Sequence, residues 1–147
     1  MSGSRYDKLL RDVSRSGVFR APSRRLPELL AAADTAGFAI IRIDLSAVRN
    51  KKELFERLAT AFALPGWFGR NWDALADCLG DLSWLPAGGY LVLLEHCDGF
   101  RASRGADFAT VLRVFAAASD AWRDLRVPFW VLVDTRSDAI VQLQEIG

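Results

Sequence analysis

Residues 90–97 read YLVLLEHC and begin with five consecutive apolar or aromatic residues. Two similar runs occur, FAIIRIDL at 38–45 and VPFWVLVD at 127–134. Each run is too short for a helix that is packed on all sides, and near-continuous apolar strands are typical of a parallel sheet covered on both faces. The three runs therefore predict three core strands of a small parallel sheet.

The segments between these runs have the spacing of helices. Asn50 followed by Glu53 is typical of an N-cap with a capping-box acid, and predicts a helix over about 51–62. Asn71 is the next N-cap candidate, and apolar residues after 107 predict a third helix over roughly 107–125. The order strand, helix, helix, strand, helix, strand predicts an α/β domain with right-handed crossovers.

The first 36 residues have weaker patterns. KLLRDV at 8–13 is weakly helical, GVFRA at 17–21 could form a short strand, and residues 24–38 resemble a helix that ends at Gly37. Such a unit would add a fourth strand at the edge of the sheet. We therefore divide the chain into an N-terminal extension, residues 1–36, which packs on the main domain, residues 37–147.

Composition and charge exclude several classes of protein. The chain has 147 residues and a net charge of +1, which gives no support for nucleic-acid binding. The N-terminus lacks the apolar segment of a signal peptide, and no apolar run approaches the length of a membrane span. The two cysteines, Cys78 and Cys97, are too few for a disulfide framework. We expect a cytoplasmic protein in which Cys78 is a small buried residue.

Catalytic motifs are missing from the sequence. There is no dinucleotide-binding or phosphate-binding glycine loop and no nucleophile elbow, and His96 is the only histidine. Glu95, His96 and Cys97 follow the second predicted strand, where we expect them simply to end it. One alternative is an enzyme that uses Asp73, Asp77 and Glu95 around a divalent cation. We expect no enzyme, no cofactor and no metal.

Three carboxylates recur at four-residue spacing on the second predicted helix, which buries Trp72, Leu75, Leu79 and Leu82. Asp73, Asp77 and Asp81 would lie one above the next, and each such like-charge pair costs a helix about 0.2–0.5 kcal/mol. No Lys or Arg stands three or four residues after any of them. Ala76 and Gly80 are their exposed neighbours, so the sequence predicts a flat, negative strip.

Two adjacent aromatic residues, Trp67 and Phe68, precede this helix in a loop that begins with Pro65 and Gly66. We expect at most one of the two rings to point fully inward. An exposed aromatic ring beside unpaired carboxylates is typical of a protein interface. The pattern predicts a surface that binds a partner with a cationic pocket.

The stretch ALPGWFGRNWDALADCL at 63–79 resembles the barstar family of intracellular ribonuclease inhibitors. A looser similarity runs from about residue 38 to residue 134 and includes VLRVF at 111–115. The resemblance implies a barstar-like fold, in which helices pack on a small parallel sheet. It also implies a non-enzymatic inhibitor or immunity protein, monomeric when free, that binds a ribonuclease. Longer bacterial members of the family resemble this layout.

The resemblance assigns roles to individual residues. It places Asp77 in the phosphate-binding site of the nuclease, where the carboxylate imitates substrate phosphate, and makes Asp73 a second acidic contact. Trp67 would stack on the catalytic histidine of the nuclease, while Gly69 and Asn71 make backbone and polar contacts. The complete partner-binding set that we expect is Trp67, Phe68, Gly69, Asn71, Asp73, Ala76, Asp77 and Gly80.

The chain departs from the family at three of its contact positions. Ala76 replaces a tryptophan between the two acids, Ala117 replaces a glutamate of the last helix, and Arg70 replaces an acidic residue. These changes leave open a second alternative, a protein with the same fold that binds a partner other than a nuclease.

Overall fold

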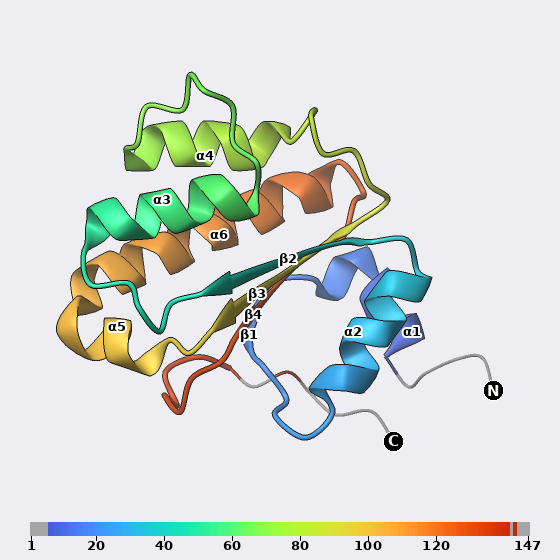
Figure 1. The fold of residues 1–147 in the computed structure, drawn as a ribbon. Helices are drawn as coiled ribbons and strands as arrows, with labels where there is room; N and C mark the ends of the chain where they lie inside the picture. The colour runs from blue at the N-terminus through green and yellow to red at the C-terminus, as the bar shows by residue number, and fades with distance from the viewer. Residues whose placement is uncertain (1–5, 142, 144–147) are drawn as a thin grey trace.

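Four parallel strands form one sheet in the computed structural model, which describes residues 6–141 and residue 143 (Figure 1). The order across the sheet is β1-β4-β3-β2, and Tyr90 of β3 pairs with Ala39 of β2 and with Phe129 of β4. The strands are β1 (Val18–Arg20), β2 (Ala39–Asp44), β3 (Tyr90–Glu95) and β4 (Phe129–Val133). The three apolar runs are thus confirmed as core strands, and β1 confirms the expected edge strand.

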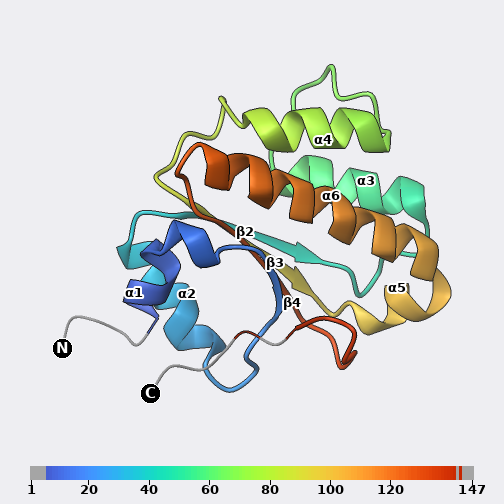
Figure 2. The same cartoon turned by 180° about the vertical axis from the view of Figure 1, so that it is seen from behind.

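Helices cover both faces of this sheet, as Figures 1 and 2 show from opposite sides. One face carries four helices, α3 (Lys51–Ala61), α4 (Trp72–Asp81), α5 (Asp98–Ser103) and α6 (Gly105–Asp124). The other face carries α1 (Asp7–Arg11) and α2 (Leu26–Thr35). A short 3₁₀ turn, Val13–Arg15, leads from α1 towards β1. The α/β class predicted from the sequence is confirmed.

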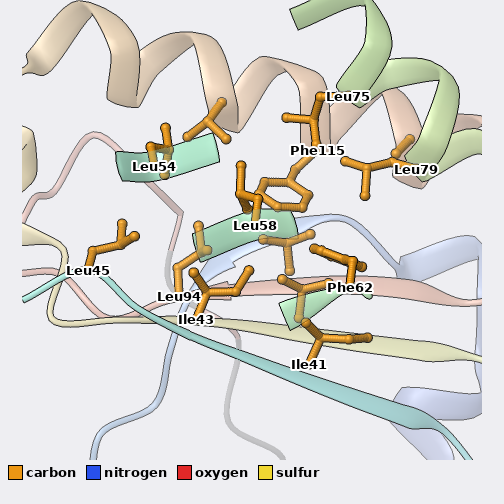
Figure 3. Packing of buried hydrophobic residues seen from close by; sticks show 14 of the residues in the cluster. Ile41, Ile43, Leu45, Leu54, Leu58, Phe62, Leu75, Leu79, Leu94 and Phe115 are labelled. Carbon is orange, nitrogen blue, oxygen red and sulfur yellow. The ribbon is translucent and has the colours of Figure 1, made fainter. Parts of the chain in front are cut away.

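The larger core lies between the sheet and α3, α4 and α6 (Figure 3). Side chains that alternate along a strand point to opposite faces, so Val92 and Leu94 of β3 face this core. The helices contribute a continuous apolar layer over them. Its labelled members in Figure 3 are Leu54, Leu58 and Phe62 from α3 and its end, Leu75 and Leu79 from α4, and Phe115 from α6.

A second core fills the opposite side of the sheet and includes residues of the N-terminal extension. Leu91 and Leu93 of β3 and Trp130 of β4 pack there against α1 and α2. The indole Nε1 of Trp130 donates a hydrogen bond of 3.0 Å to the carbonyl oxygen of Leu10, inside the protein. The two cores explain why the central strands are apolar at successive positions.

Several details differ from the predicted elements. Helix α5 was not predicted. It has six residues and only one buried side chain, Phe100, so its sequence shows no repeated apolar spacing. The helix predicted over 107–125 is α6, which begins at Gly105 and ends at Asp124. The helix predicted over 51–62 is α3, which ends at Ala61. Within the described residues, no helix combines the length and apolar character needed to cross a membrane.

Candidate functional site

Helix α4 is fixed at both ends and along its inner face. The Oδ1 atom of Asn71 accepts a hydrogen bond of 2.8 Å from the backbone N–H of Ala74, which confirms the predicted N-cap. Leu75 and Leu79 are fully buried, as is Cys78, and Leu82 ends the helix in the left-handed region at φ 47°. The helix therefore holds its remaining side chains outward in a defined register.

The outward face of α4 has the small residues and carboxylates that the sequence predicts. Asp73, Ala76, Asp77 and Gly80 are all exposed. In the part of the chain that the structure describes, neither Asp73 nor Asp77 forms an ion pair or a side-chain hydrogen bond. Asp81 differs, because its Oδ2 atom accepts a hydrogen bond of 3.1 Å from the Ser83 hydroxyl. Two carboxylates are thus left with only water to solvate them.

The loop before α4 separates its two aromatic rings. Phe68 is buried against Phe55, with ring centroids 6.0 Å apart, whereas Trp67 is 66% exposed. The expectation that only one ring points inward is therefore confirmed. Phe68 belongs to the predicted partner-binding set, and its buried ring leaves mainly its backbone accessible to a partner. Trp67 instead meets the edge of Trp84, with centroids 6.5 Å apart and ring planes at 88°.

Residues 69–71 join this loop to the helix. Asn71 Nδ2 donates a weak hydrogen bond of 3.4 Å to the Gly69 carbonyl oxygen, so the Asn71 side chain is occupied within the turn. A Cβ atom at Gly69 would lie 3.3 Å from that same nitrogen, which favours glycine here. Arg70 adopts φ 54°, and its Nη1 atom lies 3.8 Å from the Glu56 carboxylate on α3.

The last residue of β3 and the residues after it form a separate group at the carboxyl edge of the sheet. Glu95 accepts hydrogen bonds of 3.1 and 2.7 Å from the guanidinium of Arg42 on the neighbouring strand. His96 has φ 55° and donates its backbone N–H to Asp134 at 3.0 Å. Burial raises the pKa of the Cys97 thiol to about 12, with the nearby carboxylates of Asp134 and Asp98 adding to the shift. This thiol is a poor nucleophile at neutral pH.

A polar cavity of about 820 Å³ opens at the same edge, and its lining includes Asp98, Thr135 and Arg136. The Thr135 hydroxyl donates to the Asp98 carboxylate at 2.5 Å, and the backbone N–H of Arg136 also donates to it. These bonds, with Thr135 contributing most, lower the pKa of Asp98. This cavity was not predicted. Its lining residues follow different strands and come together only in the folded sheet.

The structure does not bring Glu95 together with Asp73 and Asp77, as a divalent-cation site would require. Residues 6–141 and 143 contain no group of three or more His, Cys, Asp or Glu side chains that could hold a metal ion. The Glu95 carboxylate is instead bound to Arg42. Trp84 contacts the predicted site residue Trp67 and was not predicted to belong to the site. The sequence indicates it only as an aromatic residue in the loop after the acidic helix.

The family model described as Barstar (barnase inhibitor) matches residues 38–134. The match includes β2, β3, β4 and the whole of the loop and helix described above, whereas α1, β1 and α2 lie outside it. A search of the curated proteins found no match.

Proposed function

The chain belongs to the barstar family, and from that membership we propose that it inhibits a ribonuclease by placing the carboxylates of Asp77 and Asp73 in the nuclease active site. The observation that carries this proposal is the pair of exposed carboxylates without an ion pair among the described residues, on a helix that is capped and packed. The nuclease would be blocked because these groups occupy the place of substrate phosphate. The protein itself would perform no reaction.

Charge supports the choice of partner. Between residues 67 and 98 the chain has five acidic residues and a single basic one, Arg70. A ribonuclease active site must bind the phosphates of RNA and is therefore cationic, and opposite charges accelerate the encounter of two proteins. Asp73 and Asp77 form no ion pair among the described residues, so they break none there when they meet the arginine side chains of such a site.

Geometry supports the roles of the neighbouring residues. Trp67 is exposed beside α4, where its ring can cover a partner surface, while Phe68 anchors the same loop in the core. Gly69 and Asn71 shape the turn that connects them to the helix. A loop that is already ordered loses little conformational entropy on binding, which favours affinity.

The test uses extracts and culture medium of the cells in which the protein occurs naturally. These are passed over the immobilised full-length protein, and their ribonuclease activity is compared before and after passage. We expect the wild-type protein to remove a ribonuclease that can be recovered active after denaturing elution and refolding. Asp77→Ala should fail to remove it, whereas Asp81→Ala, on the same helix, should still do so. Equal removal by all three proteins, or removal by none, would contradict the proposal.

A second candidate is a protein of the same fold that binds a partner other than a nuclease. The observation in its favour is that Ala76 and Ala117 are exposed where the family has larger contact residues, while Arg70 reverses a charge. Under this alternative, the immobilised protein would retain a partner in an Asp77-dependent manner, and the eluted fraction would contain no ribonuclease activity.

A further inference from the structure

The most exposed aromatic ring of the described chain is held in place by a second tryptophan. Trp67 is 66% exposed, and it contacts the half-buried Trp84 with ring planes nearly perpendicular. The indole Nε1 of Trp84 donates a hydrogen bond of 2.9 Å to the carbonyl oxygen of Phe62, at the end of α3. Trp84 is therefore fixed to the core side of the structure, and it limits the positions that Trp67 can take.

This pair of rings joins the two loops that flank α4. The loop that contains Trp67 arches over the outer side of α4 in both views (Figures 1 and 2), and Trp84 follows the end of the helix by three residues. Ala76 and Gly80 occupy one row of α4, and Asp73 and Asp77 occupy the next row. A Cβ atom added at Gly80 would meet no other atom within 4 Å, so the space above this row is open.

We propose that the pair Trp67–Trp84 is a docking surface for an arginine side chain of the partner protein, in place of the histidine that the family resemblance assigns to Trp67, and that Trp84 is thereby part of the binding site. This inference rests on the proposed function, because it describes the chemistry of the same partner. A guanidinium group stacks on aromatic rings while its N–H groups remain free to bind a carboxylate, which an ammonium group does less well. The exposed acids of α4, Asp73 and Asp77, form no ion pair among the described residues and favour a cationic occupant.

The small side chain of Ala76 agrees with this occupant. Ala76 is exposed, and its methyl group leaves the helix face next to Asp73 and Asp77 uncovered. We therefore infer that the partner fills the space above Ala76 and Gly80 with its own long side chain.

The experiment compares hexa-arginine with hexa-lysine peptides, both capped at their ends, binding to the full-length protein. Titrations are followed by NMR at the tryptophan indole N–H signals, with the buried Trp130 as an internal reference. We expect hexa-arginine to bind about two- to fivefold more tightly than hexa-lysine, the ratio typical of an exposed cation–π contact. The shifts should be largest for Trp67.

Three variants decide the outcome. Trp84→Ala should reduce the preference for arginine to about one, because it removes one ring of the pair and releases Trp67 from its position. Trp84→Phe should retain part of the preference, because it keeps a ring beside Trp67. Leu125→Ala, which changes an exposed apolar residue elsewhere, should leave the preference unchanged.

Two results would overturn the inference: equal binding of the two peptides by the wild-type protein, or an undiminished preference for arginine in Trp84→Ala. The peptide titration contains no nuclease, so its failure is distinct from a failure of the ribonuclease assay. A protein that removes a ribonuclease in an Asp77-dependent manner but shows no preference for arginine would keep the proposed function and lose this inference.

Discussion

Replacing Asp77 with alanine should stabilise the folded protein while it abolishes binding. Asp77 lies four residues from both Asp73 and Asp81, and each like-charge pair costs about 0.2–0.5 kcal/mol. Alanine also has a helix propensity up to about 0.7 kcal/mol better than that of aspartate. Among the described residues Asp77 makes no ion pair and no side-chain hydrogen bond, so its removal breaks no such bond there. The free energy of unfolding should rise by about 0.5–1.5 kcal/mol.

Urea denaturation at low and at high salt measures this effect, with the other two acids as controls. High salt screens the repulsion and should remove that part of the gain, while the propensity part remains. Asp73→Ala should give no gain, because a carboxylate in the first turn interacts favourably with the helix dipole by about 0.3–1 kcal/mol. Asp81→Ala should stabilise the protein without loss of binding. A lower stability of Asp77→Ala would refute the reasoning, since the carboxylate would then have a stabilising native partner.

Three further predictions concern the fold. Trp130→Phe should lower the free energy of unfolding by about 1–3 kcal/mol in urea denaturation, because the buried Leu10 carbonyl loses its hydrogen-bond donor; an unchanged stability would contradict this. Removal of residues 1–36 should expose the second core. The exposed surface should bind a hydrophobic dye and cause self-association, which sedimentation detects. A monomer that does not bind the dye would show that α1, β1 and α2 are dispensable. The hydrogen bond from the Thr135 hydroxyl is the main cause of the lowered pKa of Asp98. The ionised Asp98 carboxylate therefore stabilises the fold above the usual aspartate pKa of about 3.9, and this stabilisation is lost as pH falls through the folded-state pKa. Asp98→Asn should therefore lose less stability than the wild-type protein on acidification, as measured by urea denaturation, and parallel losses would contradict the assignment.

The strands were predictable because a central parallel strand has a strong composition signal. All five residues of β4 are buried, and the first five of β3 are as well, so neither strand needs a polar position. The edge strand β1 is shorter and only partly buried, and its pattern is correspondingly weak. Helix α5 left no periodic signal, since six residues complete less than two turns.

The acidic face was predictable for a different reason, which is that local spacing determines it. Asn71 caps the helix, and the four-residue interval then places Asp73 and Asp77 in one row whatever the rest of the chain does. The contact between Trp67 and Trp84 depends on two loops whose positions are set by the packing of α3 and α4. No local pattern encodes such a contact, and the sequence analysis missed it.

Unfavourable features are concentrated between residues 63 and 84, which argues that this segment was selected for binding. Among the described residues, five other than glycine have positive φ, and three of them are Ala63, Arg70 and Leu82. The left-handed conformation costs such residues about 1–2 kcal/mol. The same segment contains the repelling carboxylates and the exposed Trp67. Local rules of stability are broken together mainly at functional sites, because there the compensating interactions are made with another molecule. We therefore expect stabilising substitutions at the proposed contact positions of this segment, such as Asp77→Ala, to weaken binding.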